Sequence, residues 1–478
     1  MHTNTKIVCT MGPSVNAAKE ISALIEAGMD VARLNFSHGS HKEHKELIDL
    51  LKAERERLKS PLGIMLDTKG PEVRLGDLRG GVIEIEEGDE FWLVRDPVEG
   101  DKTQISIAPQ TVLDVLTVGM VVLLDDGYIK TYVTEVGPHG VKVRTLNSGV
   151  ICSRRGVNIP DAEIEMPAMT LRDIEDIKFG CREDIDFVAA SFIRSADHVL
   201  EIKKLLRQEG KSEILVIAKI ENRLGVRNFD SILAVADGIM VARGDLGVEL
   251  PLYEVPRLQK MMIRKCYSAG KPAVTATQML ESMIKNPRPT RAETSDVANA
   301  IYDSTSAVML SGETSVGKHP IQVVMMMKAI IQEAEKDFDY GEFFEKESKQ
   351  LSHDVPSSVA LSSIKTAYSA KAKAIFAFTT TGSTARLLSR LRPKMPILAL
   401  TPNKKVYHQL ALSWGIIPLY HKEATNLNDA YVKISDYAQE QKFVQKGDLV
   451  VITAGAPFGR PGSTNMIIVD FIGDDRLI

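Results

Sequence analysis

The 478-residue sequence has few cysteines, little excess charge of either sign and no long apolar run, and each shortage excludes a class of protein. The four cysteines are far apart and form no CxxC pair, so they indicate neither a zinc site nor a disulfide framework and fit a reducing cytosol. No stretch of roughly 18 apolar residues occurs, and the start, "MHTNTKIVCTMG", lacks the hydrophobic run of a signal peptide. We therefore expect a soluble, cytoplasmic protein with no membrane partner.

The charge balance argues against nucleic acid as the main partner. The chain has 59 basic and 63 acidic residues, a formal net charge of -4 and no Lys/Arg-rich arm, although a local basic patch is compatible with these totals. The hydrophobic fraction of 44% supports large cores, and the length exceeds the size at which one core usually stops growing. These quantities predict two or three domains.

Eight short apolar runs recur along the chain, each ending in polar residues or glycine and most of them followed by a helical pattern. Such an alternation indicates parallel strands covered on both sides, and eight units are the number in a (β/α)8 TIM barrel, whose active site forms from the loops after the strands. The runs that predict this α/β fold are "KIVCTMG", "VARLNFSHG", "GIMLDTKG", "FVAASF", "ILVIAKIEN", "GIMVARGD", "PAVTATQ" and "SAVMLSGE".

The spacing of the runs is interrupted once, between Gly70 and Phe187, where short alternating runs with turn signals indicate a small inserted all-β domain. Placed after the third strand, it would emerge over the active-site face as a lid. After the barrel, a polar stretch at 337–358 predicts a connector, and five more strand-like runs predict a C-terminal α/β domain. The predicted domains are residues 1–70 and 167–345 for the barrel, 71–166 for the β-barrel lid and 346–478 for the C-terminal regulatory domain.

Charged side chains gather where the predicted barrel strands end. The run "LVIAKIEN" is apolar until Lys219 and Glu221, which lie two residues apart and so project to the same face. A single Lys-x-Glu at a strand end is most often a solvent-facing ion pair, but five charged strand ends in one barrel favour a functional site. Glu221 and Asp245, from adjacent strands, could share a hard cation such as Mg²⁺, with Lys219 and Arg33 facing an anionic substrate.

Several long strings of the sequence resemble the pyruvate kinase family in the family's own order. They are "KIVCTMGP", "RLNFSHG", "LDTKGPEVR", "DFVAASFIR", "AKIEN", "VARGDLGVE", "TATQMLESM" and "VMLSGET". The resemblance covers essentially the whole chain, including the inserted β domain and the extra C-terminal domain. It implies a phosphotransferase of glycolysis that transfers the phosphoryl group of phosphoenolpyruvate to ADP, giving pyruvate and ATP, and it leads us to expect a homotetramer.

The resemblance also implies roles for the rim residues. Lys219 would contact the transferring phosphoryl group, and Glu221 and Asp245 would hold Mg²⁺ or Mn²⁺ beside it. Thr277 would lie near the step that protonates the enolate, although a threonine hydroxyl is a poor acid unless it relays a proton from water. The residues expected to contact phosphoenolpyruvate are Arg33, Lys219, Gly244, Asp245 and Thr277, of which Arg33, Lys219 and Thr277 are the expected catalytic residues.

A monovalent-cation site and a nucleotide site are implied in the same way. The oxygen donors of Asn35, Ser37, Asp67 and Thr68 match the family's K⁺ site. A glutamate in the string "KGPE" accompanies dependence on K⁺, so Glu72, whose own string offers no cationic partner apart from Lys69, predicts activation by K⁺. Nucleotide contacts are expected from Asn35, His38, Arg74 and Arg155.

Two features concern regulation and departures from the family. "TTTGSTAR" resembles the family's effector loop, where hydroxyls and amides at a helix start can hold a phosphate of a sugar phosphate or AMP, although the same string also fits an ordinary helix-capping loop. Thr380 stands where members selective for a sugar bisphosphate can have lysine, and Ser195 replaces a lysine on the nucleotide side. The candidate effector residues are Thr379, Thr380, Thr381, Gly382, Ser383, Thr384 and Arg460.

Two other functions fit parts of the same sequence. Aldolase or carboxyl-transferase barrels that act on phosphoenolpyruvate or pyruvate-type substrates also place acidic metal ligands near an arginine, but the inserted domain and the K⁺-type residues argue against them. A non-catalytic sugar-phosphate-binding protein on an inactivated kinase scaffold is the second alternative. The presence of Lys219, Glu221, Asp245 and Thr277 argues against it.

Overall fold

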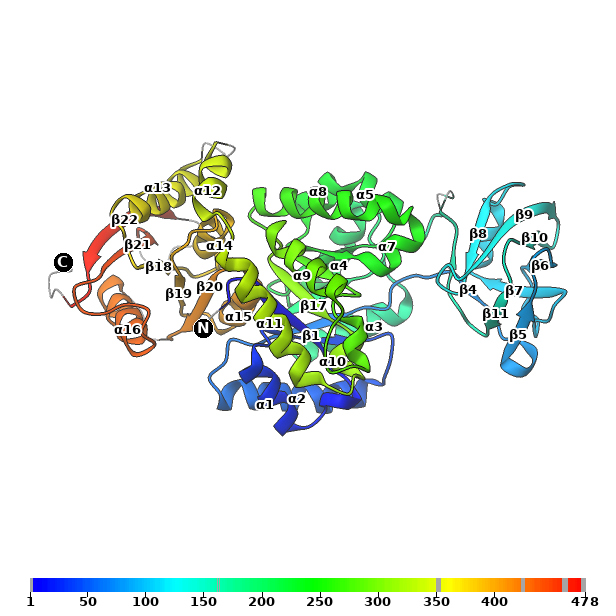
Figure 1. Ribbon diagram of the computed structural model, residues 1–478, viewed down its shortest axis with the longest axis horizontal. Coiled ribbons are helices and arrows are strands. Elements are labelled where there is room, and N and C mark those ends of the chain that lie inside the picture. Colours follow the sequence, from blue (N-terminus) through cyan, green and yellow to red (C-terminus); the bar gives the residue numbers. More distant parts are fainter. Residues whose placement is uncertain are drawn as a thin grey trace.

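The computed structural model describes residues 3–160, 162, 164–349, 354–422, 426–457 and 463–473. Figure 1 shows three units side by side, with the β domain at one end, the barrel in the middle and the C-terminal domain at the other end. The predicted fold class is confirmed: a closed parallel barrel carries an inserted all-β domain and a C-terminal α/β domain.

The eight apolar runs form the eight barrel strands. Each strand pairs in parallel with its neighbours in the closed order β1-β17-β16-β15-β14-β13-β3-β2. Because all eight run the same way, their carboxyl ends meet on one rim, beside the inserted domain (Figure 1). The strands are β1 (Lys6–Thr10), β2 (Val31–Asn35), β3 (Gly63–Asp67), β13 (Phe187–Ala190), β14 (Leu215–Ile220), β15 (Gly238–Ala242), β16 (Ala273–Ala276) and β17 (Ala307–Leu310).

Helices cover the outside of the barrel, and their apolar faces form one large core with the strands. Three of them begin with a capping box, in which a Ser or Thr and an acidic residue three positions later exchange hydrogen bonds with each other's backbone amides. The helices are α1 (Ala18–Ala27), α2 (His41–Arg57), α3 (Leu171–Arg182), α4 (Ala196–Gln208), α5 (Arg223–Arg227), α6 (Phe229–Val235), α7 (Arg243–Glu249), α8 (Val255–Ser268), α9 (Arg291–Tyr302), α10 (Gly312–Ser315) and α11 (Pro320–Lys336).

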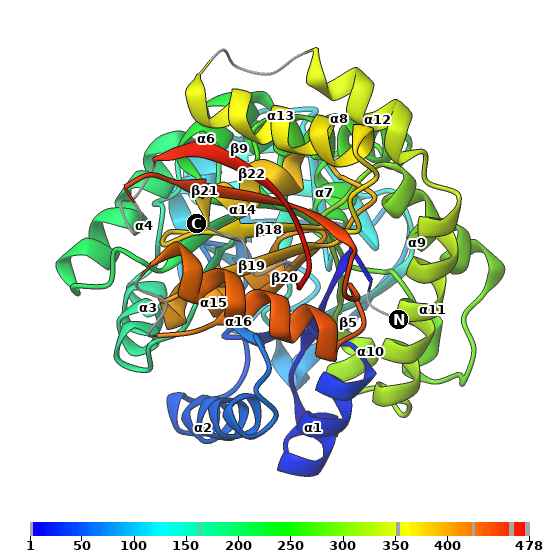
Figure 2. The same cartoon turned by 90° about the vertical axis from the view of Figure 1, so that its left-hand side faces the viewer.

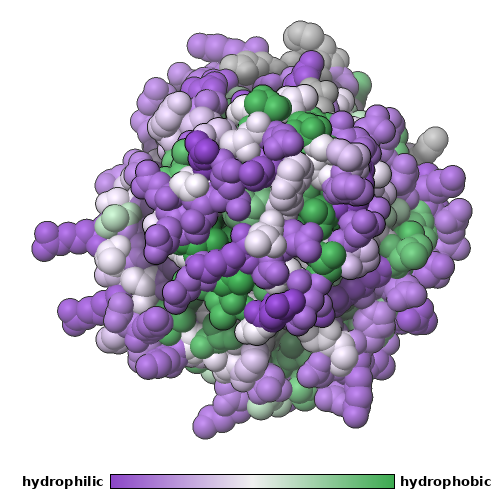
Figure 3. Space-filling view, turned by 90° about the vertical axis from the view of Figure 1, so that its right-hand side faces the viewer, coloured by the Kyte–Doolittle hydropathy of each residue, from purple (hydrophilic) through white to green (hydrophobic). Residues whose placement is uncertain are grey.

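The inserted domain, called the lid below, has its own core of alternating inward-facing residues. A seven-stranded sheet in the order β12-β8-β9-β10-β6-β7-β4 is accompanied by the pair β11-β5. Viewed from the lid end, the surface is mostly hydrophilic with small hydrophobic patches (Figure 3). The strands are β4 (Arg74–Leu75), β5 (Val82–Ile85), β6 (Glu90–Val94), β7 (Gln104–Ala108), β8 (Val121–Leu124), β9 (Ile129–Gly137), β10 (Gly140–Thr145), β11 (Gly149–Cys152) and β12 (Val157–Asn158).

The C-terminal domain is a five-stranded sheet in the order β20-β19-β18-β21-β22, parallel except for β22. Helix α16 packs on one face and α13, α14 and α15 pack on the other (Figure 2). The elements are α13 (Val355–Ser369), β18 (Ala374–Phe378), α14 (Ser383–Arg390), β19 (Ile397–Thr401), α15 (Lys404–Gln409), β20 (Ile416–Tyr420), α16 (Leu427–Glu440), β21 (Leu449–Gly455) and β22 (Thr464–Phe471).

Two segments join the barrel to the C-terminal domain. The predicted connector is largely helical, because α12 (Tyr340–Ser348) occupies much of it and buries Phe344, whose ring lies 5.4 Å from that of Tyr368. At the amino ends of the barrel strands, Ala411 and Leu412 pack into the apolar core inside the barrel. The C-terminal domain is therefore in direct contact with the layer of side chains beneath the rim. No helix among the described residues has the length and apolar character needed to cross a membrane.

Candidate active site

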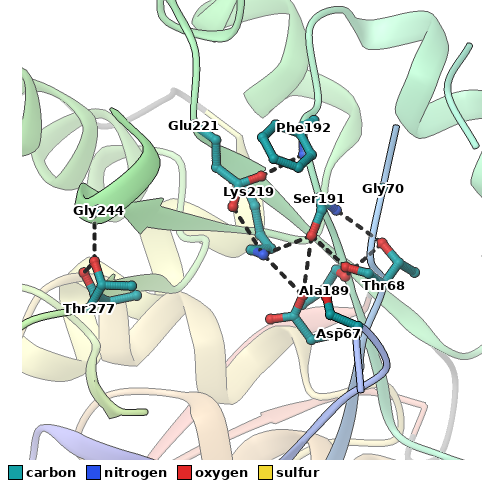
Figure 4. A network of polar contacts seen from close by, with 12 residues as sticks. Asp67, Thr68, Gly70, Ala189, Ser191, Phe192, Lys219, Glu221, Gly244 and Thr277 are labelled. Carbon is teal, nitrogen blue, oxygen red and sulfur yellow. Dashed lines mark hydrogen bonds and ion pairs between the residues drawn. The ribbon is translucent and has the colours of Figure 1, made fainter. Parts of the chain in front are cut away.

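Lys219, near the end of β14, is the centre of the rim. Its ammonium group lies 3.0 Å from Asp67 Oδ1, 2.7 Å from Ser191 Oγ and 3.0 Å from Glu221 Oε1 (Figure 4). Burial disfavours its charge, but Asp67 and Glu221 outweigh that cost and raise the pKa of Lys219 above its ordinary value. Lys219 and Glu221 project to the same side, as the sequence predicts. A buried and charged lysine therefore lies at the carboxyl ends of the barrel strands.

Asp67 holds a second cation next to Lys219. Arg33 Nε donates to Asp67 Oδ2 at 2.5 Å, and Arg33 Nη1 donates to Thr10 Oγ1 at 2.8 Å. Asp67 is completely buried; burial alone would raise its pKa, but Arg33 and Lys219 together lower it below the ordinary value. One carboxylate therefore fixes both cations that were predicted to face the substrate.

Ser191, which follows β13, was missed in the sequence. Its hydroxyl donates to the Thr68 carbonyl oxygen at 2.6 Å, lies 3.2 Å from Asp67 Oδ1 and accepts from Lys219. Its amide donates to Thr68 Oγ1 at 3.1 Å. Its position was the available signal, because Ser191 stands directly after an apolar barrel strand, as Thr68, Glu221 and Thr277 do.

Glu221 and Asp245 form the acidic side of the rim. Glu221 accepts from the Phe192 amide at 2.5 Å, and burial, with the nearby Asp245, raises its pKa to about 6 although Lys219 acts in the opposite direction. Asp245 lies in the first turn of α7, where burial raises its pKa and Lys219 opposes the shift. The buried carboxylate of Glu221 and the exposed carboxylate of Asp245 are a suitable donor set for Mg²⁺ or Mn²⁺, which prefer oxygen ligands and use few from the protein. Among the described residues, no group of three or more His, Cys, Asp or Glu forms a closed metal site.

Thr277 and Gly244 contact each other across the ends of β15 and β16. The Gly244 amide donates to Thr277 Oγ1 at 2.8 Å, and that hydroxyl donates to the Ala276 carbonyl oxygen at 2.6 Å. Thr277 has a left-handed backbone with φ of +69°, which is uncommon for a β-branched residue. Arg243 donates to the Thr277 carbonyl oxygen at 2.8 Å and pairs with Asp296, so it braces this strained turn.

The four residues assigned to K⁺ lie at the neighbouring ends of β2 and β3, where Asn35 is the register partner of Asp67. Asn35 Oδ1 accepts from the Ser37 amide at 3.2 Å, and the Thr68 carbonyl oxygen accepts from Ser191. Both carboxylate oxygens of Asp67 already accept from Arg33 or Lys219. The four residues lie close together. Because both oxygens of the Asp67 carboxylate accept from cations, the oxygen atoms left to bind an ion belong to neutral groups.

Glu72 has a cationic partner just beyond the string "KGPE". Arg74 Nε donates to Glu72 Oε2 at 2.6 Å. Two residues apart on an extended chain, the two side chains point to the same side, as Lys219 and Glu221 do. Arg74 also donates to the Arg154 carbonyl oxygen at 2.7 Å, so it is held at the base of the lid.

A cavity of about 380 Å³ lies between the lid and the rim. It is lined by Arg74, Asp126 and Asn158 on the lid side and by Arg194, Asp245 and other residues on the barrel side. Asn158 Nδ2 donates to Glu249 Oε1 at 2.8 Å and so connects the two sides. The other predicted nucleotide contacts, Asn35, His38 and Arg155, are not among its lining residues.

Those three residues lie elsewhere around the rim. Arg155, on the lid, pairs with Asp125 at 3.3 Å, while the His38 side chain is exposed and its carbonyl oxygen lies 2.9 Å from His44 Nε2. Ser195, which replaces a family lysine, caps α4 by accepting from the His198 amide at 3.4 Å. This capping role explains how the chain uses the residue that departs from the family.

The predicted effector loop connects β18 to α14. Gly382 has φ of +83°, Thr381 Oγ1 donates to Ser383 Oγ at 3.1 Å, and Thr384 Oγ1 lies 2.7 Å from Thr464 Oγ1. The buried hydroxyl of Thr379 has no hydrogen-bond partner among the described residues, whereas Thr380 is only half-buried. Arg460 lies outside the described residues.

Comparisons with known proteins agree with this geometry. A family model described as "Pyruvate kinase, barrel domain" matches residues 2–324, and one described as "Pyruvate kinase, alpha/beta domain" matches residues 357–469. The chain is 44% identical to a pyruvate kinase from Clostridium acetobutylicum, covering 98% of the chain and 99% of the relative. It is 45% identical to one from Staphylococcus aureus, covering 98% and 81%. A crystal structure of a pyruvate kinase from Cryptosporidium parvum matches with a TM-score of 0.94 and 37% identity over 98% of the chain and 96% of the other.

Proposed function

The chain belongs to the pyruvate kinase family and is a phosphotransferase, and we propose that it moves the phosphoryl group of phosphoenolpyruvate to ADP with Mg²⁺ or Mn²⁺ at Glu221 and Asp245 and K⁺ at the ends of β2 and β3. Phosphoryl transfer depends mainly on positioning and on neutralising charge, and a rim with two fixed cations beside the carboxylates of Glu221 and Asp245 offers both.

The observation that carries the proposal is the hydrogen bonding of Lys219. Of its three N–H donors, Lys219 uses two in hydrogen bonds to Asp67 and Ser191, and it forms an ion pair with Glu221 Oε1 at 3.0 Å. A phosphoryl oxygen would therefore compete with the Glu221 ion pair rather than with the two hydrogen bonds. Because the other oxygen of Glu221 accepts from the Phe192 amide, Oε1 is also the oxygen that would coordinate a cation.

Glu221 therefore links metal binding to the release of Lys219. With a divalent ion held by Glu221 and Asp245, one N–H of Lys219 would be available to the substrate while Asp67 and Ser191 would retain the other two. The bound ion would supply positive charge to substrate oxygens. Arg33, fixed on Asp67 and Thr10, offers its remaining donors to the same anion.

We assign the protonation step to the turn at Thr277. Its hydroxyl proton is donated to the Ala276 carbonyl oxygen, so the hydroxyl has to rotate before it can pass a proton toward the enolate. This arrangement supports a relay from water rather than direct donation by threonine. Gly244 and Asp245, at the start of α7, would hold the substrate carboxylate and the metal next to that turn.

The remaining assignments follow from the family. Asn35, Ser37, Asp67 and Thr68 would bind K⁺, and Asn35, His38, Arg74 and Arg155 would contact ADP or ATP. A sugar phosphate or AMP would act at residues 379–384 with Arg460. We also propose a cytoplasmic homotetramer.

A steady-state assay with ADP, phosphoenolpyruvate, Mg²⁺ and K⁺ tests the proposal. We expect pyruvate and ATP in equal amounts, lower activity when K⁺ is replaced by a bulky organic cation, and a response to at least one compound in a panel of sugar phosphates and AMP. Production of pyruvate without ATP would contradict phosphoryl transfer to ADP. Full activity without K⁺ would contradict the monovalent site, and an absence of response to the panel would contradict the effector loop.

A further inference from the structure

A small cavity lies where the barrel meets the C-terminal domain, and it is surrounded by cationic side chains. Its volume is about 20 Å³. The lining residues come from the end of α8 and the segment after it, from Ser306 before β17, from α14 with the residues that follow it, and from the segment before β20. Four of them are basic, and none of the described residues that line it is acidic: Lys271, Arg386, Arg390 and Arg392.

Arg392 is the most deeply buried of these cations, with 1% of its surface exposed. Its Nη2 donates to the Ser304 carbonyl oxygen at 2.5 Å, and its guanidinium lies 4.4 Å from the centre of the Trp414 ring. Its Nε and Nη1 have no hydrogen-bond partner among the described residues. Two strong donors of a buried guanidinium are therefore unsatisfied inside the protein, which is costly for a group that stays charged.

The surrounding acids do not reach Arg392. Glu335 is the nearest source of negative charge, but its two carboxylate oxygens accept from the backbone amides of Thr5 and Asn4 at 2.7 and 3.0 Å. Glu347 lies close enough to influence Arg390 and accepts from Ser268 Oγ at 3.2 Å. Burial lowers the pKa of Arg392 to about 9 in spite of Glu335, which is consistent with a cation that lacks a bonded partner.

We propose that this cavity is a site for a single monatomic anion, chloride under physiological conditions, bound to Nε and Nη1 of Arg392. A volume of about 20 Å³ suits a small spherical ligand. A water molecule would accept hydrogen bonds from Nε and Nη1 but would bring no negative charge. Because Lys271 donates to the Leu233 and Ala234 carbonyl oxygens, the charge that favours an anion is chiefly that of Arg392, whose two nitrogens lack partners among the described residues.

The site would also connect three parts of the fold. Arg392 and Trp414 belong to the C-terminal domain, while Ser304 and Lys271 belong to the barrel. Arg386 extends from the cavity to the effector loop, where its Nη2 donates to the Thr381 carbonyl oxygen at 2.8 Å. A bound anion would therefore hold the joint between the two domains next to the loop that precedes α14.

Thermal unfolding of the full-length protein in potassium chloride, potassium bromide or potassium gluconate, at constant ionic strength, tests the site. Gluconate, a bulky polyhydroxylated carboxylate, is the reference anion. We expect the two halides to raise the Tm saturably by about 1–3 °C, as ligands of the native state do. Arg392→Met should lose this response, and Arg207→Met, which removes an exposed arginine of α4, should keep it.

Crystals grown in bromide give a second measurement that needs no variant. We expect an anomalous scattering peak between Nε and Nη1 of Arg392. The proposal is overturned if the cavity has no anomalous peak and contains water, or if halides and gluconate give the same Tm. It is also overturned if Arg392→Met folds and keeps the halide response.

Discussion

Lys219 at the rim and Arg392 at the domain joint are both buried cations, 9% and 1% exposed, with opposite environments. Lys219 donates hydrogen bonds to Asp67 and Ser191 and forms an ion pair with Glu221, and its pKa is raised. Arg392 has one carbonyl acceptor and lies over the rings of Trp414 at 4.4 Å and Phe343 at 6.0 Å, and its pKa is lowered. A buried cation whose partners can exchange is suited to chemistry, because a substrate or a metal can replace one acceptor. A buried cation with unsatisfied donors is suited to binding a ligand that remains part of the folded structure.

The largest effect is expected from Lys219→Met. This change removes the charge aimed at the phosphoryl group, and we expect kcat to fall on the order of a hundredfold or more, as for other single electrostatic donors. Divalent-ion affinity, measured by Mn²⁺ binding, should be retained or increased, because Glu221 loses a competing cation. Lys211→Met, which removes a surface lysine paired with Asp184, is the control. Near-normal turnover in Lys219→Met would remove this lysine from the mechanism.

Glu221→Gln and Asp245→Asn should come next in size. Each removes one charge from a site with two carboxylates, so we expect each to raise the Mg²⁺ concentration needed for half-maximal activity by about tenfold or more. Calorimetric titration of the free protein with Mn²⁺ gives an independent measure of the same loss. Glu281→Gln serves as a control, because Glu281 lies outside the rim network. Unchanged metal titrations in both site variants would rule out a shared divalent site.

The proposed K⁺ site differs from the acidic metal site of the same rim, because the oxygen atoms left to bind K⁺ belong to neutral groups. We expect strong activation by K⁺ over Na⁺ and partial independence of K⁺ in Glu72→Lys, whose ammonium group could occupy the same region. Because Glu72 pairs with Arg74, this variant should also raise the KM for ADP. Initial rates in K⁺, in Na⁺ and in a bulky organic cation measure both effects. If the variant requires K⁺ as strongly as the wild type, Glu72 does not determine the dependence on K⁺.

Ser191→Ala tests whether catalysis depends on the hydrogen bond between Lys219 and Ser191 when Glu221 coordinates a metal ion. We expect kcat to fall by about tenfold with little change in the KM for phosphoenolpyruvate, because the ammonium group is then held by Asp67 alone. Ser191→Thr keeps the hydroxyl and should recover part of the rate. A Ser191→Ala variant that changes only stability would reduce Ser191 to a structural role.

Much of this fold could be predicted from the sequence because its signals are local. Each barrel strand is a largely apolar run, and each rim residue lies near its carboxyl end or directly after it, so both the strands and the Lys219–Glu221 pair could be identified. The helix α12 was read only as a connector, because its charged sequence hides the buried Phe344.

Contacts between distant segments could not be predicted in the same way. Ser191 acts through Asp67 and Thr68, more than 120 positions earlier, and nothing in its own run distinguishes it from an ordinary strand-end serine. The Glu72–Arg74 pair was local and could have been found, since the two side chains share one face of an extended segment. The environment of Arg392 depends on Ser304, which is 88 positions away, and on a tryptophan from a third segment.

The smallest effect on activity is expected from Arg392→Met. This variant also tests whether Arg392 and Lys219 really differ in how fully their donors are satisfied. Replacing an unpaired buried charge by an apolar chain of similar length is often neutral or stabilising, whereas removing one partner of a satisfied pair is costly. The loss of the Ser304 hydrogen bond and of the contact with Trp414 acts in the opposite direction. In potassium gluconate we therefore expect the variant to keep kcat within about threefold and Tm within about 2 °C of the wild type. In chloride the wild type alone should gain stability, so the gap between the two proteins should widen with the halide concentration. A Tm that falls by about 10 °C or more in gluconate would mean that protein groups already satisfy Arg392, and the contrast with Lys219 would then be lost.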